Sequence, residues 1–395
     1  MASTHIEGET RHEISGIEAP LSVTIIAHDL GSVGGMERQL EDLVLGLRRR
    51  GHEVTVIART CELPESAGVI FHRVRTPRRP FLLAYPLFMV AGSLALRRWR
   101  RGVVQATGAI VLNHVDVISV HYCHQVGPVH PSRSTRLYRA QVTAAGLLKR
   151  IGERHCFRAN GEAAFVCVSD GVAEDMRTYF PDLAERITTI HNGVDTDRFA
   201  PGARAEEARA RRDSLNIGAE QLVAVFVGSE WERKGLEPAI RALSLAPDWT
   251  LVIAGGGEQS RYRRLAESAG VGESMRWLGV TPDVQLLYQL ADAFLLPSSY
   301  EAFSIATLEA AASGLPMLVT PVNGARELIE DGQNGFLIGQ DPDEIAERLN
   351  RLAADPALRE RLGKAARESA LKFGAGRMVE QHRALYQRLA LGRRT

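Results

Sequence analysis

The stretch LPSSYEAFSIATLEAAASGLPMLVTP, residues 296–321, decides how the rest of this chain is interpreted. An apolar run at 291–296 predicts a buried strand, turn residues follow at 297–299, and a helix is expected over 304–313. The first backbone N–H groups of a helix lack intrahelical partners and therefore attract anions. A strand, turn and helix in this order, with the small residue Ser304 at the helix start, predict a phosphate-binding site.

Two carboxylates bracket this helix start, Glu301 in the loop before it and Glu309 inside it. At about 1.5 Å rise per helical residue, Glu309 lies roughly 7 Å beyond Ser304. A nucleotide sugar matches this arrangement, because its diphosphate lies between a sugar, which would face Glu301, and a ribose, which would face Glu309. The alternative is that Glu301 caps the helix and Glu309 is a solvated surface acid.

Together with Phe303, Ser304, Gly314 and Pro316, the two glutamates form the pattern P-S-x-x-E-x-F-S-x-x-x-x-E-A-x-x-x-G-x-P. This pattern resembles the signature of the retaining family 4 glycosyltransferases. The resemblance implies an α/β protein with the GT-B fold, in which two Rossmann-like domains face an interdomain cleft. It also implies sugar transfer with retention of configuration and without a metal or other cofactor.

The composition is that of an ordinary globular protein. At 395 residues, 45% hydrophobic and 24% charged, the chain can form two or three domains with a large core. The cysteines at 61, 123, 156 and 167 show no paired spacing and are interpreted as reduced thiols of a cytoplasmic protein. Residues 1–20 are polar and lack an apolar core, so we expect a loose tail rather than a secretory signal.

The charge of the chain is unevenly distributed. Between residues 69 and 160 stand fifteen Lys or Arg and two acids, a net charge of +13. Such a block indicates an acidic partner, which is anionic lipid, a phosphorylated acceptor or nucleic acid. Nucleic acid ranks last, because no helix-turn-helix, zinc-finger or aromatic RNA-binding pattern is found.

The first βαβ unit begins with a strand at 21–27, a glycine-rich turn at 28–35, a helix at 36–50 and a strand at 52–58. A dinucleotide-binding interpretation fails, since the second strand ends in Arg59 rather than an acid. Gly34 and Gly35, followed by Glu37, instead resemble the G-G-x-E loop of family 4 enzymes, whose backbone faces the diphosphate and the acceptor. A plain tight turn is the alternative.

An apolar segment, PFLLAYPLFMVAGSLAL at 80–96, is flanked by arginines on both sides. Its seventeen residues stand at the short limit of the roughly 17–25 that span a bilayer, and it contains two prolines, so we do not predict a transmembrane helix. It is either a helix of the first domain or a segment that lies on an anionic membrane. In the second case residues 73–101 contact the inner face of the cell membrane.

Strands are expected at 109–112 and 115–120, and the second ends in His121-Tyr-Cys-His124. A residue just past the carboxyl end of a parallel strand lies at the edge where open α/β sheets bind ligands. The resemblance implies that His121 touches the donor sugar. A metal pair with His124 and a plain structural histidine are the alternatives.

The run N-G-V-D-T-x-x-F-x-P at 192–201 resembles the interdomain segment of the same family, and a second βα series begins at 221. Lys234, with Arg233 beside it, can offset the diphosphate charge and stabilise the leaving group. The form G-S-x-x-x-R-K-G at 228–235 resembles the glucosyltransferases of lipopolysaccharide core and favours a UDP donor. The residues expected to bind the donor are Gly34, Gly35, Gly228, Arg233, Lys234, Gly279, Val280, Glu301, Phe303, Ser304, Ile305 and Glu309, and those expected in catalysis are His121, Lys234 and Glu301.

Four parts are predicted: a tail (1–20), an acceptor-side domain (21–200), a nucleotide-sugar-binding domain (201–374) and a helix that returns to the first domain (375–395). The predicted reaction transfers a hexose or N-acetylhexosamine from a nucleoside diphosphate to a hydroxyl of a glycan, glycolipid or small molecule. The alternatives are a UDP-sugar 2-epimerase on the same fold and a non-catalytic nucleotide-sugar-binding scaffold.

Overall fold

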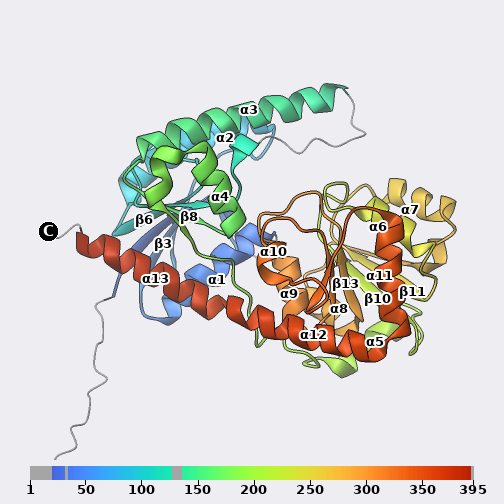
Figure 1. Ribbon diagram of the computed structural model, residues 1–395. Coiled ribbons are helices and arrows are strands. Elements are labelled where there is room, and N and C mark those ends of the chain that lie inside the picture. The colour runs from blue at the N-terminus through green and yellow to red at the C-terminus, as the bar shows by residue number, and fades with distance from the viewer. Residues whose placement is uncertain (1–19, 32–33, 127–135, 393–395) are drawn as a thin grey trace, which may run out of the picture.

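The computed structural model describes residues 20–31, 34–126 and 136–392 of the chain. Figure 1 shows two α/β lobes side by side, with the last two helices lying along one side of both. Of the tail predicted over 1–20, only Pro20 belongs to the described residues, so the prediction of a loose tail lies outside them.

The first lobe is built on a seven-stranded parallel sheet. In spatial order its strands are β5 (Ile70–Arg73), β3 (Glu53–Ala58), β1 (Ser22–Ile26), β6 (Val103–Thr107), β7 (Val117–Val120), β8 (Ala164–Cys167) and β9 (Ile187–Thr189). Helices cover both faces of such a sheet, so its central strands are apolar on both sides. Strand β1 shows this pattern, because Val23 and Ile25 point to one face of the sheet, Ile26 points to the other, and all three are fully buried.

Each face of the first sheet carries its own helices. Helices α2 (Phe81–Trp99) and α3 (Arg136–Ala159) lie over one face, and α1 (Gly35–Arg49) and α13 (Ala375–Gly392) over the other (Figure 1). The amphipathic pattern predicted for the helix after the glycine-rich turn is confirmed, since Leu40, Leu43 and Leu47 of α1 are buried. Burial of each such side chain stabilises the fold by about 1.5–3 kcal/mol.

The second lobe is built on a six-stranded parallel sheet. In spatial order its strands are β12 (Met275–Gly279), β11 (Trp249–Ala254), β10 (Leu222–Val227), β13 (Ala293–Leu296), β14 (Met317–Val319) and β15 (Gly335–Leu337). Its helices are α5 (Ala205–Ser214), α6 (Leu236–Leu243), α7 (Gln259–Ser268), α8 (Val284–Leu290), α9 (Ile305–Ala312), α10 (Ala325–Leu328), α11 (Pro342–Ala354) and α12 (Pro356–Ala370). The predicted α/β architecture with two Rossmann-like sheets is confirmed.

One predicted strand is wrong. Residues 109–112 form no strand, and the strand between β1 and β7 is β6, which the sequence analysis missed. The chain leaves β6 at Gly108, whose φ of 79° is left-handed, and then runs through the core as a loop in which Ile110 and Val111 are buried. A short apolar run signals burial, and burial alone does not distinguish a strand from a packed loop.

Two segments connect the lobes, and they are hydrogen-bonded to each other. The N–H of Val194, after β9, donates to the carbonyl of Phe373 at 2.9 Å, and the N–H of Ala375 donates back to Val194 at 2.9 Å. The chain then continues into α13, which packs against α1 with Val379 facing Gly46. The hydroxyl of Tyr386 in α13 donates to Gln105 of β6 at 2.5 Å, so the last helix is part of the first lobe's core.

Candidate active site

The centre of the site is a buried cluster of two cations and one carboxylate. The ammonium Nζ of Lys234 lies 2.7 Å from Oε1 of Glu301, and Nη1 of Arg233 lies 3.1 Å from the same oxygen. Ser298 donates its hydroxyl to this oxygen at 2.9 Å. Burial on its own raises the pKa of Glu301, but Lys234 and Arg233 more than reverse this effect, so its pKa is lowered. The carboxylate therefore stays charged in the interior.

Two glycines shape the space around Lys234. The side chain of Lys234 crosses Gly228 so closely that a Cβ there would come within 2.4 Å of it, and the φ of Gly228 is 148°. Gly235 begins α6 in a left-handed conformation, and a Cβ there would come within 2.0 Å of the carbonyl oxygen of Pro297. Only glycine fits either position, which brings the Lys234 loop against the loop that carries Glu301.

Ser304 begins α9 as predicted. Its hydroxyl caps the helix by accepting from the N–H of Thr307 at 3.3 Å, so Ser304 and not Glu301 is the capping residue. The glycine-rich loop of the first lobe lies directly opposite this helix start, since a Cβ on Gly35 would be 3.3 Å from the side chain of Ile305. The structure thus brings the two predicted phosphate-binding segments together.

Glu309 is neither a solvated surface acid nor an open ligand. Its side chain is 3% exposed and forms an ion pair with Arg38 of α1. Its second oxygen accepts from the hydroxyl of Tyr288 at 3.0 Å. Burial raises the pKa of Glu309, and Arg38 and Tyr288 offset part of this rise. The sequence analysis missed both partners, and no local pattern marks them, because Arg38 lies 271 residues away.

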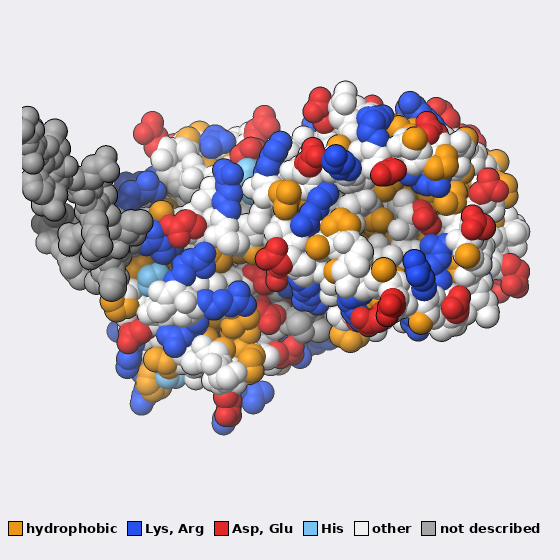
Figure 2. All heavy atoms as spheres, turned by 90° about the horizontal axis from the view of Figure 1, so that it is seen from below, with side chains coloured by type: hydrophobic (Ala, Val, Ile, Leu, Met, Phe, Trp, Pro, Cys, Tyr) orange, Lys and Arg blue, Asp and Glu red, His pale blue; other side chains and the backbone are white. Residues whose placement is uncertain are grey.

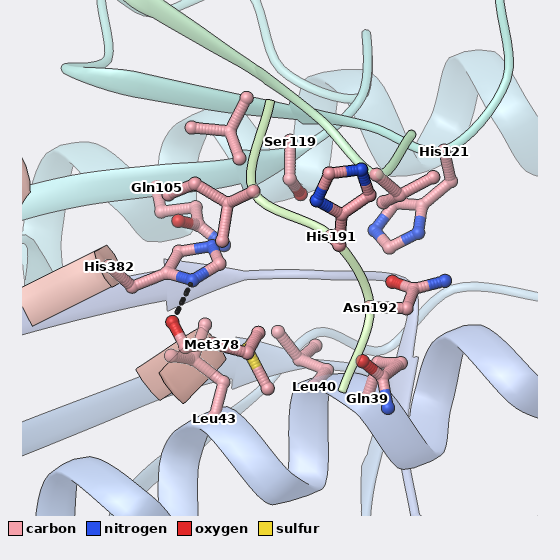
Figure 3. A pocket seen from close by; sticks show the side chains of 13 residues that line it. Gln39, Leu40, Leu43, Gln105, Ser119, His121, His191, Asn192, Met378 and His382 are labelled. Atoms are coloured by element: carbon pink, nitrogen blue, oxygen red, sulfur yellow. Dashed lines mark hydrogen bonds between the residues drawn. The ribbon is translucent and has the colours of Figure 1, made fainter. Parts of the chain in front are cut away.

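His121 lies at the end of β7, where it lines a cavity of about 30 Å³ with His191 and His382 (Figure 3). A cavity of this size can hold water, and His121 is itself only half-buried. Burial lowers the pKa of His121 to about 4, and His382 adds to the effect. The imidazole is therefore neutral at physiological pH. Among the described residues, neither His121 nor His124 belongs to a group of side chains close enough to share a metal.

Three further donor-site candidates are Phe303, Gly279 and Val280. Phe303 is buried, with its ring packed against His191 and Phe373 at centroid distances of 5.6 and 5.3 Å. Gly279 accepts from the N–H of Gly255 at 2.8 Å, and Val280 beside it is 72% exposed. The structure thus places Phe303 in a packing role, whereas Gly279 and Val280 stand at the edge of the second sheet.

A pair of aromatic rings joins the two lobes beside the cluster. Tyr122, the residue after His121, meets Tyr300, the residue before Glu301, edge to face at a centroid distance of 4.8 Å. Burial raises the pKa of Tyr122 to about 12. Among the described residues, the buried hydroxyl of Tyr300 has no hydrogen-bond partner. This contact brings the loop of His121 and the loop of Glu301 together, and sequence spacing gave no sign of it.

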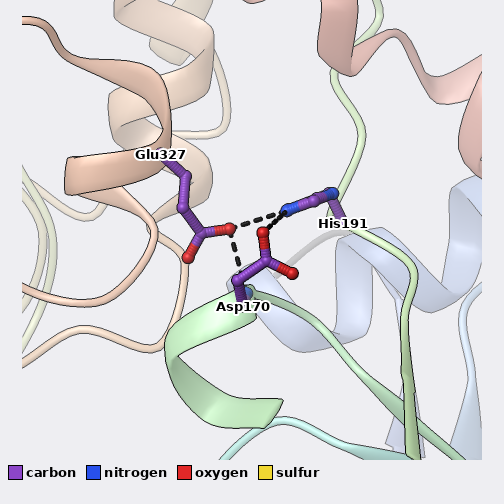
Figure 4. Close-up of side chains that lie close together, drawn as sticks. All are labelled: Asp170, His191 and Glu327. Atoms are coloured by element: carbon purple, nitrogen blue, oxygen red, sulfur yellow. Dashed lines mark hydrogen bonds and ion pairs between the residues drawn. The ribbon is translucent and has the colours of Figure 1, made fainter. Parts of the chain in front are cut away.

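Glu327 of α10 clamps the second lobe to the first, as Figure 4 shows. Its carboxylate accepts from the N–H groups of Asp170 and Gly171 at 3.0 and 3.2 Å, at the start of α4 (Asp170–Tyr179). Nε2 of His191 lies 2.6 Å from the same group. Asp170, His191 and Glu327 are close enough to hold a metal ion. The carboxylate of Glu327 is already occupied by these hydrogen bonds between the lobes, so its position needs no metal ion to account for it.

Comparison with known proteins supports a family assignment. The model of Glycosyltransferase Family 4 matches residues 33–198, and that of Glycosyl transferases group 1 matches residues 207–369. The D-inositol 3-phosphate glycosyltransferase of Thermobifida fusca is 31% identical over 368 residues, which are 85% of this chain and 84% of that protein.

Two solved structures share the whole fold. WaaG, a glycosyltransferase involved in lipopolysaccharide biosynthesis, matches with a TM-score of 0.77 and 23% identity over 91% of this chain and 98% of its own. HepE of Anabaena in complex with UDP-glucose matches with a TM-score of 0.72 and 19% identity over 94% and 99%. These likenesses confirm the predicted GT-B arrangement of the two lobes.

Proposed function

This chain belongs to the glycosyltransferases that carry a family 4 and a group 1 domain, and from that premise we propose that it transfers a hexose or N-acetylhexosamine from UDP to an acceptor hydroxyl with retention of configuration. The observation that carries the proposal is the cluster of Lys234, Arg233 and Glu301 beside the start of α9. Nη2 of Arg233 is also paired with Glu230 at 2.8 Å, so the proposal rests on two fixed cations beside a helix N-terminus rather than on a net charge, and both features favour a diphosphate.

Lys234 and Arg233 would act on the leaving group. As the bond between the anomeric carbon and the β-phosphate oxygen breaks, negative charge develops on the diphosphate. Fixed cations in a buried site stabilise that charge without reorganisation. The fixed positions of both cations come from Glu301, whose carboxylate holds them 2.7 and 3.1 Å away. We propose that Glu301 also accepts hydrogen bonds from the sugar.

In this proposal the anomeric configuration is retained because the acceptor oxygen attacks the anomeric carbon from the same face that the diphosphate leaves. The acceptor oxygen bonds to the anomeric carbon while its proton passes to the departing β-phosphate oxygen, so UDP leaves and no protein atom is consumed. A double displacement would need a carboxylate free to attack the anomeric carbon. Glu301 is ion-paired and Glu309 is bound to Arg38, so neither is suited to that role.

His121 would orient the sugar. Its imidazole is neutral, since burial lowers its pKa to about 4, so it can donate or accept a hydrogen bond but supplies no charge. The contact between Tyr122 and Tyr300 supports this role, because it joins the neighbours of His121 and Glu301.

UDP as the donor is supported by the resemblance of residues 228–235 to lipopolysaccharide glucosyltransferases and by HepE, which was solved with UDP-glucose. The basic block between 69 and 160 favours an anionic acceptor, and the Thermobifida relative is named for a phosphorylated one, D-inositol 3-phosphate. Cytoplasmic location with peripheral binding to the inner face of the cell membrane belongs to the same proposal.

A thermal-shift screen without added metal tests the donor assignment. UDP, GDP and ADP are compared, together with their glucose, N-acetylglucosamine and mannose conjugates. We expect a selective rise with UDP and its conjugates, since a ligand that binds only the folded state stabilises it. No shift with any uridine compound, or a larger one with GDP or ADP, would contradict the proposal. A 2-epimerase or a scaffold would leave the sugar untransferred, which product analysis by NMR detects.

A further inference from the structure

Helix α2 has two apolar faces, of which the fold covers one. Ala84, Phe88, Gly92 and Leu96, spaced four residues apart, are buried against the first sheet. The opposite face is equally apolar and nothing among the described residues covers it. The exposed fractions along it are Leu83 60%, Leu87 50%, Val90 54% and Leu94 61%.

The spacing of the exposed residues places them on one line. Leu83, Leu87, Val90 and Leu94 stand at positions i, i+4, i+7 and i+11, which form a single stripe along about three helical turns. Single exposed apolar side chains are common on soluble proteins, but a continuous stripe marks an interaction surface. Figure 2 gives a contrast, since on the face that carries α12 and α13 apolar side chains are scattered among charges of both signs.

Helix α2 is anchored in the first lobe, although its 19 residues and apolar composition would allow a membrane span. Phe88 and Leu96 are fully buried, and the hydroxyl of Tyr85 donates to the carbonyl of Ala109 at 2.5 Å. To cross a bilayer the helix would have to leave this core. Its exposed stripe therefore meets its partner on the surface of the lobe.

Positive charge stands at both ends of the stripe. Arg97 and Arg98 lie three and four positions after Leu94 on the same helix and extend the line, whereas Arg79 stands just before the helix, which begins at Phe81. All three are exposed. Trp99, 37% exposed, stacks on His72 with ring centroids 4.0 Å apart.

The segment of the chain that carries the stripe contains few acids. The segment 69–160 contains two, and neither is exposed. Asp116 accepts from the N–H of Val104 at 2.7 Å, and the buried Glu153 accepts from the N–H of His124 at 2.8 Å. An apolar line with arginines at its ends, in a segment that has no exposed acid, is complementary to anionic lipid, whose acyl region accepts the leucines while its phosphates pair with the arginines.

We propose that this stripe of α2 is the surface by which the protein binds an anionic membrane, with α2 lying parallel to the bilayer. The inference rests on the peripheral association contained in the proposed function and adds the residues that make the contact. The membrane surface does not depend on the identity of the donor or on catalysis. The membrane proposal can therefore fail while the proposed transfer reaction holds, and the reverse is also possible.

Co-sedimentation with vesicles tests the surface. The full chain is mixed at low salt with vesicles of phosphatidylcholine containing about one third phosphatidylglycerol, and separately with phosphatidylcholine alone. We expect binding to the first and release at high salt, because screening weakens the arginine contribution. Absence of binding to the anionic vesicles, or equal binding to both kinds, would overturn the proposal.

Variants separate the two parts of the surface. The pair Leu83→Glu and Leu87→Glu is expected to abolish sedimentation, whereas Leu245→Glu, an exposed leucine of the second lobe, is expected to leave it unchanged. The pair Arg97→Ala and Arg98→Ala should weaken binding about 25-fold, or about fivefold for each arginine near an anionic surface. An unchanged melting temperature of each variant without ligand shows that the fold is intact. If the leucine variant still binds the vesicles as the wild type does, the stripe is not the membrane surface. If the wild type is a dimer in solution and the leucine variant is a monomer, the stripe binds a second copy of the chain instead.

Discussion

Arg38 and Glu309 form an ion pair between the two lobes, although 271 residues separate them in the chain. The carboxylate is buried, and its other oxygen accepts from Tyr288 at 3.0 Å. A buried charge is stable only with partners, so the first lobe supplies what the second lobe's carboxylate requires. The sequence predicts that the same carboxylate faces the ribose of the donor. A bound donor would then share this side chain with Arg38 and Tyr288.

Loss of Arg38 should destabilise the protein. Arg38→Ala leaves the carboxylate of Glu309 buried with Tyr288 alone, and we expect the free energy of unfolding to fall by about 3 kcal/mol at pH 8. The loss should be smaller at pH 5, where Glu309 can take up a proton. Urea denaturation at both values of pH measures it. In a double-mutant cycle with Glu309→Gln the two losses should not add; additive losses would show that the ion pair carries no coupling.

Loss of Glu309 should weaken donor binding. If Glu309→Ala removes hydrogen bonds between a charged carboxylate and the ribose, the dissociation constant of UDP rises about 10- to 100-fold. Isothermal titration calorimetry measures it, with Glu330→Ala, an exposed acid of the same lobe, as the control. Wild-type affinity in the Glu309 variant would mean that the ribose binds elsewhere.

Loss of Lys234 should act mainly on turnover. Lys234→Met removes a fixed cation from the leaving diphosphate, and we expect kcat to fall at least about 100-fold with a smaller change in KM. The rate of UDP release reports both constants once an acceptor is found, and donor hydrolysis reports them before that. Lys364→Met, an exposed lysine on α12, is the control. A change confined to KM would show that Lys234 binds the donor equally well in the ground state and in the transition state.

Asp42 should make stability fall as pH rises. Burial raises its pKa to about 7, and the neighbouring Glu41 and Asp195 add to the rise. A carboxyl whose pKa is raised in the folded state is protonated there while it is ionised in the unfolded chain, so between about pH 4 and 7 the free energy of unfolding decreases with pH. Asp42→Asn should therefore stabilise the protein by about 1–3 kcal/mol at pH 8 and leave it unchanged near pH 4. Equal effects at both values of pH would contradict the assignment.

Loss of Glu327 should let the lobes separate. Glu327→Ala removes the acceptor of the N–H groups of Asp170 and Gly171 and the partner of His191. We expect a larger radius of gyration by small-angle X-ray scattering and about 1–2 kcal/mol less stability, because two N–H groups at the helix start lose their acceptor while the Ser169 cap remains. Glu330→Ala is again the control. An unchanged radius of gyration would show that other contacts hold the lobes together.

The sequence predicted the features that depend on local pattern. Strands, helices and the turn before Ser304 could be identified from apolar periodicity and glycine positions, and the resemblance brought Lys234 and Glu301 to one site. Contacts between distant segments have no local signal. Arg38 is an ordinary surface residue of an amphipathic helix until Glu309 is folded beside it, and Tyr122 and Tyr300 meet only once both lobes are assembled. The error at 109–112 has the same origin, since an apolar loop and a strand differ in their partners rather than in their residues.

The position of α13 fixes when the first lobe can be completed during synthesis. The last strand of the first sheet ends at Thr189, but Tyr386, which is fully buried against that lobe, emerges from the ribosome roughly 200 residues later. At about 5–20 residues per second this is a delay of roughly 10–40 s. Throughout that time the face of α1 that α13 later covers is exposed. This apolar face includes Leu40, Leu43 and Gly46, the glycine that Val379 will contact. A nascent first lobe thus exposes this surface until α13 has been made, and a chain that stops before residue 375 exposes it permanently.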